Sequence, residues 1–207
     1  MTIVDISNLV LASASPRRQS LMQEAGYRFG VVSPPIAEPD EVIGKLPPAQ
    51  QAESLAYFKA RSVADGRPQS LVVGADTIVA VGGQVLGKPS DAADAGRMLR
   101  KLSGSRHVVI TGLALLGPGG ERLIASDVTY VTMRKMTSRQ IDDYIASGEW
   151  IDKAGAYAIQ ETAQDRFIEK VEGSFSNVVG LPMELLDKML RELVSHPEKH
   201  RVDLCAR

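Results

Sequence analysis

The segment richest in groups that could do chemistry is residues 13–18, SASPRR, which lies where a predicted strand is followed by a predicted helix. Backbone N–H groups at the start of a helix carry partial positive charge and attract anions. The guanidinium groups of Arg17 and Arg18 can hold phosphate oxygens in a fork geometry, and the hydroxyls of Ser13 and Ser15 can add donors. The segment indicates an anion site. The alternative is a plain serine cap followed by two solvated arginines.

Two lysines could extend the same site. Lys59 follows Leu55 by four residues, so it lies on the apolar stripe of its predicted helix. A lysine there either reaches past the apolar surface to water or points into a cleft toward the anion. Lys88 directly precedes Pro89, which is a rigid setting for a further cation.

Two carboxylates are candidates for the reactive groups. Asp76 lies in the segment 74–77, GADT, which is predicted to end an otherwise apolar strand. The carboxyl end of a buried strand is where α/β proteins usually place their sites. Asp76 is therefore a candidate general base or metal ligand, with a simple turn aspartate as the alternative. Glu38, in a proline-rich loop, is a candidate second carboxylate.

A glutamine and a histidine complete the set of candidates. Gln160 ends a strand-like run, residues 152–160, and its amide can both donate to and accept from one base edge. Exposed glutamines are common, so this signal is weak by itself. His107 begins a predicted strand and is interpreted as a structural hydrogen-bonding residue rather than a catalyst. The sequence contains neither a P-loop nor a dinucleotide-binding glycine fingerprint.

The elements that must position these residues alternate between strand-like and helix-like patterns, which favours an α/β fold. A capping box at Thr137 and Gln140 begins one helix, and Gly148 ends it. Two hairpins are predicted, one across Gly82-Gly83 and one across residues 117–120. Strands are expected at 8–13, 29–33, 71–76, 108–116 and 123–133, and helices at 17–25, 49–65, 91–102 and after Pro182.

Composition limits the classes of function. The 207 residues include 24 Lys and Arg against 25 Asp and Glu, so the net charge of −1 argues against a nucleic-acid partner. No apolar stretch approaches the roughly 18 residues of a membrane span. The single cysteine, Cys205, allows no internal disulfide, which favours a cytoplasmic location. We expect one domain over 1–207, with a core at about 9–190 and a tail at about 195–207.

Taken together, these segments resemble the Maf-type nucleoside triphosphate pyrophosphatases. The resemblance runs in order from about residue 9 to residue 190. Its segments are 11–18 (LASASPRR), 55–60 (LAYFKA), 74–79 (GADTIV), 87–89 (GKP), 103–107 (SGSRH), 152–160 (DKAGAYAIQ) and 173–182 (GSFSNVVGLP).

The resemblance implies an inosine triphosphatase-like fold, in which helices flank an elongated mixed sheet and a cleft separates two lobes. It also implies hydrolysis of a nucleoside triphosphate between the α- and β-phosphates, with Mg or Mn as the metal and a homodimer as the assembly. In a family-like mechanism Asp76 is the proton acceptor or a metal ligand, and Glu38 completes the carboxylate site. Ala37 stands where the family usually has an acidic residue, so a supporting carboxylate is missing.

Three positions carry the expected substrate choice. Members that act on dTTP and UTP resemble this chain in having Arg17, Thr77 and Gln160. The branch that acts on 7-methylguanosine triphosphate has Trp, Gln and Glu at these places. The neutral amide of Gln160 can donate and accept, as uracil or thymine requires, so the pyrimidine interpretation is favoured. The alternatives are a 7-methylguanosine triphosphate pyrophosphatase and a nucleotide-binding regulator of septum formation.

Overall fold

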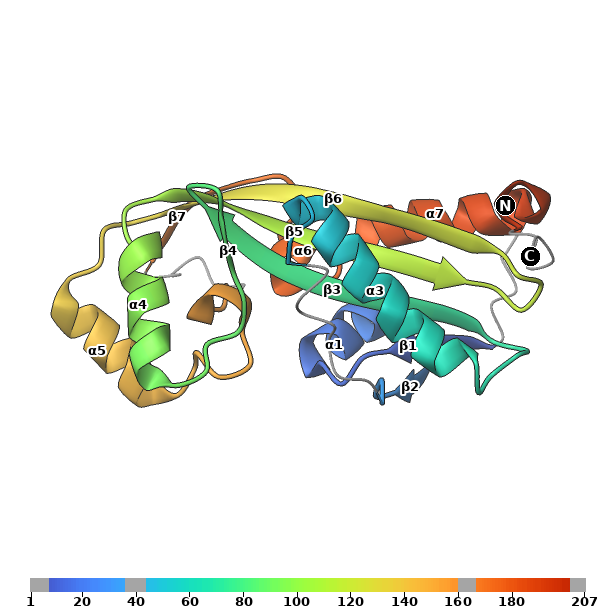
Figure 1. The fold of residues 1–207 in the computed structure, drawn as a ribbon, viewed down its shortest axis with the longest axis horizontal. Coiled ribbons are helices and arrows are strands. Elements are labelled where there is room, and N and C mark those ends of the chain that lie inside the picture. The colour runs from blue at the N-terminus through green and yellow to red at the C-terminus, as the bar shows by residue number, and fades with distance from the viewer. Residues whose placement is uncertain (1–7, 36–43, 160–166, 202–207) are drawn as a thin grey trace.

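In the described residues of the computed structural model (8–35, 44–159 and 167–201), seven strands form one sheet in the order β2-β1-β3-β5-β6-β7, with β4 paired to β3 (Figure 1). β1 runs parallel to β2 and β3, and the other neighbours pair antiparallel. The predicted α/β class with an elongated mixed sheet is confirmed. The strands are β1 (Leu9–Ala12), β2 (Gly30–Val32), β3 (Leu71–Val81), β4 (Gln84–Leu86), β5 (Arg106–Leu116), β6 (Arg122–Met133) and β7 (Ile168–Glu172).

Helices cover both faces of this sheet. α3 packs on one face through Ala56 and Ala60, and α1 and α7 pack on the other through Met22 and Leu186.

In the described chain, no helix is long and apolar enough to cross a membrane. The helices are α1 (Pro16–Glu24), α3 (Pro48–Ala64), α4 (Ala92–Leu102), α5 (Ser138–Ser147), α6 (Phe175–Val179) and α7 (Met183–Ser195), with short 3-10 helices η1 (Ala154–Ala156) and η2 (Pro197–His200).

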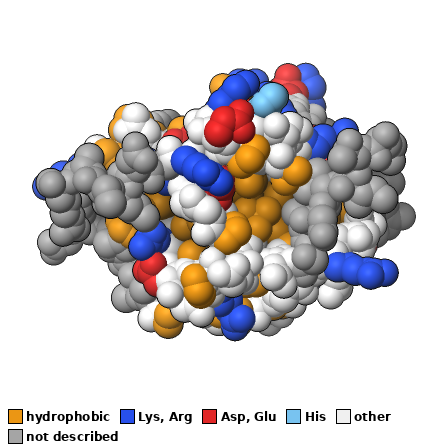
Figure 2. Space-filling model, turned by 90° about the vertical axis from the view of Figure 1, so that its right-hand side faces the viewer, with side chains coloured by type: hydrophobic (Ala, Val, Ile, Leu, Met, Phe, Trp, Pro, Cys, Tyr) orange, Lys and Arg blue, Asp and Glu red, His pale blue; other side chains and the backbone are white. Residues whose placement is uncertain are grey.

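The molecule has two lobes joined by the long strands. β1, β2, α1, α3 and α7 lie toward one end, and α4 and α5 lie at the other (Figure 1). The second lobe has its own core, in which Leu99 of α4 and Ile141 of α5 meet Val79 and Val131 of the sheet. Seen from the end where the β5–β6 hairpin lies, the first lobe shows hydrophobic side chains at its centre and charged side chains around them (Figure 2). The two lobes therefore have separate apolar cores on one continuous sheet.

The structure corrects the predicted end of the third strand. β3 does not end at Asp76 but continues to Val81, because its pairing with β5 is unbroken through this region, with Thr77 opposite Thr111. A polar residue in an apolar run was wrongly interpreted as a strand end. The hairpin across Gly82-Gly83 is confirmed, and both glycines have the positive φ (56° and 78°) that a tight two-residue turn requires.

The other edge of β3 is interrupted. β1 pairs with β3 only as far as Gly74, and β4 joins it from Val79 onward. In the described part of the chain, no strand pairs with residues 75–78 on this side, and we call this stretch the edge gap. The sheet thus opens at the point where the parallel pairing of β1 gives way to the antiparallel pairing of β4.

Two glycines bring α3 very close to the sheet. A Cβ atom added to Gly74 would lie 2.2 Å from the carbonyl oxygen of Ala56, and one added to Gly112 would lie 2.3 Å from the carbonyl carbon of Ala52. Only residues without a side chain allow this approach. The close packing places Lys59, one turn beyond Ala56, beside the edge gap.

The prediction of a strand-like run over 152–160 is wrong for its described part. Residues 154–156 form the 3-10 turn η1, and Asp152 and Ala156 have left-handed backbone conformations (φ 58° and 63°). Gly155 donates its N–H to the carbonyl of Gly87, which ties this turn to the loop after β4. The described part of this segment is therefore a turn that lines the cleft through residues such as Lys153 and Tyr157, and not a strand. By contrast, the capping box at Thr137 and the left-handed Gly148 are confirmed.

Candidate active site

A cleft of about 590 Å³ opens at the edge gap, between the two lobes. Part of its lining is cationic and part is apolar. The cationic part is Arg17, Arg18, Lys59, Lys88 and Lys153. The apolar part is Val79, Val109, Ile151, Tyr157, Ile159 and Val178. The structure therefore brings the predicted residues Ser13, Ser15, Arg17, Arg18, Lys59, Asp76, Thr77 and Lys88 to one cleft. Glu38 and Gln160 lie outside the described residues.

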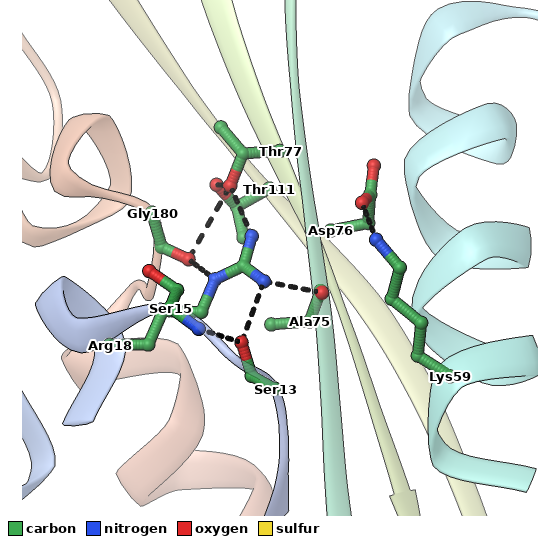
Figure 3. Close-up of polar contacts among 9 residues, drawn as sticks. All are labelled: Ser13, Ser15, Arg18, Lys59, Ala75, Asp76, Thr77, Thr111 and Gly180. Carbon is green, nitrogen blue, oxygen red and sulfur yellow. Dashed lines mark hydrogen bonds and ion pairs between the residues drawn. The ribbon is translucent and has the colours of Figure 1, made fainter. Parts of the chain in front are cut away.

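Asp76 and Lys59 form an ion pair at the cleft wall (Figure 3). Asp76 lies on β3 and faces α3, and the Lys59 ammonium donates to its Oδ1 atom. Both side chains are largely buried, with exposed fractions of 11% for Asp76 and 15% for Lys59. Lys59 therefore does not extend past the apolar surface to water. It neutralises the carboxylate that the sequence marks as the reactive group.

The Arg18 guanidinium fills the edge gap (Figure 3). Its Nη1 donates to the carbonyl of Ala75 (2.8 Å) and to Ser13 Oγ (3.3 Å). Its Nε donates to the carbonyl of Gly180 (2.8 Å), and its Nη2 donates to Thr77 Oγ1 (3.1 Å). Arg18 thus takes the place of a strand neighbour, and most of its donors are directed to acceptors of the protein itself.

The two serines organise the turn that leads into α1. Ser13 is buried, and its hydroxyl oxygen accepts from the backbone N–H of Ser15 (3.2 Å) as well as from Arg18. Ser15 occupies the N-cap position of α1, but its side chain makes no capping bond. The alternative of a serine cap followed by two solvated arginines is therefore wrong for Arg18, which is held by the protein.

Arg17 and Lys153 face the cleft from different lobes. Burial lowers the pKa of the Arg17 guanidinium, which still leaves an arginine charged at neutral pH. Burial and, after it, the positive charge of Arg17 lower the pKa of the Lys153 ammonium. Two cations that repel each other across a cleft favour an anion between them. Sequence reasoning missed Lys153, although its position next to Asp152 in the family segment was a usable signal.

The apolar wall is fixed by a buried histidine. Tyr157 lies edge-on to His107, with ring centroids 5.4 Å apart, and its hydroxyl is 2.7 Å from His107 Nε2. His107 is 2% exposed, and burial lowers its pKa to about 4, so the imidazole is neutral at pH 7. The expectation of a structural hydrogen-bonding histidine agrees with this geometry. The sequence did not single out Tyr157 as part of the site.

The donor chemistry of the cleft fits a divalent cation that arrives with its substrate. Within the described ranges, no three His, Cys, Asp or Glu side chains are grouped as a metal cage. Mg²⁺ is commonly held by one or two carboxylates together with substrate phosphates. The Asp76 carboxylate, at the wall of a cleft lined with phosphate-binding groups, is suited to that arrangement.

Comparisons with known proteins identify the family of this chain. The family model described as "Maf-like protein" matches residues 8–193. A dTTP/UTP pyrophosphatase of Geobacillus sp. (strain WCH70) is 44% identical over 188 residues, which cover 91% of this chain and 97% of that protein. One of Moorella thermoacetica is 46% identical over 186 residues, covering 89% and 94%. A solved structure of the Staphylococcus aureus Ham1 protein has 16% identity and a TM-score of 0.48, covering 88% of this chain and 97% of that one. The chain belongs to the Maf family, as its motifs predicted.

Proposed function

We propose that this protein is a nucleoside triphosphate pyrophosphatase that hydrolyses dTTP and UTP to the monophosphate and pyrophosphate. The observation that carries the proposal is a single cleft that combines a cluster of cations, a carboxylate and an apolar wall. A triphosphate supplies the negative charge that the cations require, and a pyrimidine base supplies a flat apolar face for the wall. The names of relatives that are 44% and 46% identical support the same activity.

The phosphates would bind at the cationic part of the cleft. Arg17 and Lys153 approach the cleft from the two lobes, and Lys88 lies exposed at its rim. Charge-assisted hydrogen bonds from these groups to phosphate oxygens are stronger than neutral ones. Phosphoryl transfer depends mainly on such positioning and charge stabilisation.

Asp76 would accept the proton of the attacking water. Before substrate arrives, its carboxylate is paired with the Lys59 ammonium. Phosphate oxygens compete with Asp76 for this ammonium, and when Lys59 turns to them the carboxylate is presented to water. The water oxygen then forms a bond to the α-phosphorus as its proton passes to Asp76, the bond from the α-phosphorus to the oxygen shared with the β-phosphorus breaks, and pyrophosphate leaves with that oxygen.

A divalent cation, Mg or Mn, would be held by Asp76 together with the substrate's phosphate oxygens. The second carboxylate of this proposal is Glu38. When bound, the cation supplies charge stabilisation on the phosphate oxygens. The donor set of carboxylate and phosphate oxygens suits a hard cation and not a thiolate- or imidazole-binding metal.

Base recognition would rest on the apolar wall and on Arg17, Thr77 and Gln160. Tyr157 offers a ring surface whose position is set by His107. The pairing of a neutral amide at Gln160 with a pyrimidine edge is the part of the proposal that separates this protein from an enzyme for 7-methylguanosine triphosphate.

A substrate panel tests the proposal directly. Pyrophosphate release is measured for dTTP, UTP, dCTP, ATP, GTP and 7-methylguanosine triphosphate, each with Mg and with Mn. We expect dTTP and UTP to have the highest kcat/KM. A preference for 7-methylguanosine triphosphate would refute the assignment, and tight nucleotide binding without turnover would favour the regulator. Cytoplasmic location and a homodimer remain predictions, to be tested by cell fractionation and by light scattering of the purified protein.

A further inference from the structure

A chain of hydrogen bonds leads from the cleft into the core of the protein. Arg18 donates to Thr77 Oγ1 at 3.1 Å, and Thr77 Oγ1 lies 3.0 Å from Thr111 Oγ1. Thr111 Oγ1 donates to the backbone carbonyl of Asn177 at 3.1 Å. Figure 3 shows the first part of this chain, with the hydroxyls of Thr77 and Thr111 next to each other near the Arg18 guanidinium. The four groups come from α1, β3, β5 and α6, so the chain ties α1 to the sheet and to α6.

The two ends of this chain favour one direction for each of its bonds. A guanidinium can only donate and a backbone carbonyl can only accept, whereas each threonine hydroxyl has one proton. With the proton of Thr111 directed to the carbonyl of Asn177, the bond between the hydroxyls carries the proton of Thr77. The carbonyl of Gly180 is a more distant acceptor for Thr77, at 3.4 Å. Thr77 therefore presents a lone pair, and not a proton, to Arg18.

The inner end of the chain is rigid. Thr111 and Asn177 are fully buried, at 0% exposure each. The Asn177 side chain donates to the carbonyl of Val109 (3.1 Å) and to Thr129 Oγ1 (2.9 Å). The carbonyl of Asn177 also accepts from the backbone N–H of Gly180 (3.0 Å), so the end of α6 holds it at a fixed place as the acceptor for Thr111.

We propose that Thr111, which does not line the cleft, is a positioning residue for the hydrolysis of triphosphates, an inference that rests on the proposed function. Its hydroxyl takes the proton of Thr77 and so turns the Thr77 oxygen toward Arg18. Arg18 is then held across the edge gap, where its charge faces the phosphates. In this arrangement Thr77 influences substrate recognition through Arg18, because its own proton is directed to Thr111.

Removal of the Thr111 hydroxyl tests this role. Thr111→Val keeps the shape of the side chain and deletes the acceptor for the Thr77 proton. We expect kcat/KM for dTTP to fall about five- to tenfold, mainly through a higher KM. The inhibition constant of inorganic triphosphate should rise by the same factor, whereas that of thymidine should not change. Thr111→Ser restores the hydroxyl and should return kcat/KM to within about twofold of the wild type.

Leu115→Val is the matched control. Leu115 is equally buried, on the same strand β5, and it packs in the apolar core of the first lobe. Its side chain has no polar group and takes no part in the chain of hydrogen bonds. Leu115→Val should lower Tm about as much as Thr111→Val while kcat/KM for dTTP stays within about twofold of the wild type. An equal kinetic loss in both variants would overturn the proposal.

A double-variant cycle gives the decisive readout. If Thr77 acts through the bond to Thr111, Thr77→Val together with Thr111→Val should lose no more kcat/KM than Thr77→Val alone. Additive losses would contradict the chain. If Thr111→Val does not fold, Thr111→Cys keeps most of the volume with a poor donor and acceptor, and should show the same rise in the inhibition constant.

Failure of the proposed function can be told apart from failure of this inference. If the wild type releases no pyrophosphate from any triphosphate, the function is wrong, and binding of inorganic triphosphate measured by calorimetry still tests the chain. Binding that is weakened by Thr111→Val and restored by Thr111→Ser supports it. Equal binding by wild type and Thr111→Val overturns it.

Discussion

Asp76 and Thr77 are consecutive in the chain and point to opposite faces of the sheet. Asp76 meets Lys59 of α3 on one face, and Thr77 meets Arg18 of α1 on the other (Figure 3). Neighbouring residues of a strand always alternate in this way, and in an unbroken sheet they could not share a site. They both line the cleft because the edge gap opens β3 to the cleft from its side.

Replacement of the carboxylate at position 76 should remove catalysis and leave the fold intact. Asp76→Asn keeps the size of the side chain but cannot accept a proton from water, so kcat for dTTP should fall about 10²–10⁴-fold. Asp65→Asn, at the end of α3 with a side chain that is 58% exposed, is the control and should keep full activity. Wild-type kcat in Asp76→Asn at matched metal concentration would exclude Asp76 as the proton acceptor.

Enlarging Gly74 should separate α3 from the sheet. In Gly74→Ala the new methyl group would meet the carbonyl of Ala56 at 2.2 Å, so the helix has to move away. We expect a loss of about 1–3 kcal/mol in the free energy of unfolding, measured with urea, together with lower kcat because Lys59 moves with the helix. Gly66→Ala is the matched control, since its added methyl would have only an ordinary contact at 3.9 Å. Unchanged stability in Gly74→Ala would contradict the close packing.

The buried imidazole of His107 should make stability depend on pH. Burial lowers its folded pKa to about 4, from 6.5 in an exposed histidine. Between these two values the unfolded chain binds a proton that the folded chain does not, so the free energy of unfolding should decrease as pH falls from about 6.5 toward 4. The slope from this one group is at most about 1.4 kcal/mol per pH unit.

Urea denaturation of His107→Gln at several pH values isolates this contribution. The variant should show a shallower decrease between pH 6.5 and 5 than the wild type. His196→Gln, which alters a half-exposed histidine, should keep the wild-type slope and serves as the control. Identical slopes for His107→Gln and the wild type would show that His107 takes up its proton at the same pH in both states.

Removal of the charge of Lys153 should weaken binding of the triphosphate. Lys153→Met keeps the unbranched shape and most of the length of the side chain, and the KM for dTTP should rise about tenfold because a charge-assisted bond to phosphate is lost. The salt dependence of KM should also become weaker. Lys188→Met, on the exposed side of α7, is the control for a general change in net charge. An unchanged KM in Lys153→Met would place this lysine outside the phosphate site.

The sequence predicted most elements of the fold because their signals are local. The capping box at Thr137, the left-handed Gly148 and the Gly82-Gly83 turn are each formed by residues close together in the chain. The predicted end of β3 was wrong because the true end depends on pairing with β5, which continues past Asp76. Local pattern contains no information about a partner strand that is more than thirty residues away.

For the candidate site, residue types were predictable and their pairings were not. Lys59 was expected to reach either water or the anion. In the structure its ammonium donates to the carboxylate of Asp76, 17 residues further along the chain. Arg18 was expected to hold phosphate oxygens in a fork geometry, yet its Nε donates to the carbonyl of Gly180, 162 residues away. The family model and the relatives confirm the predicted family, whereas the roles of the individual site residues await the variants above.

The continuity of the sheet between the two lobes has a mechanical consequence. β3, β5 and β6 contain 11, 11 and 12 residues, and each contributes to both apolar cores. To bring the lobes together, these strands would have to bend along their length, which distorts many ladder hydrogen bonds at once. The width of the cleft is therefore set by the bending stiffness of the hydrogen-bonded sheet that joins the lobes. A nucleotide binds in a cleft whose width is already fixed in the folded protein.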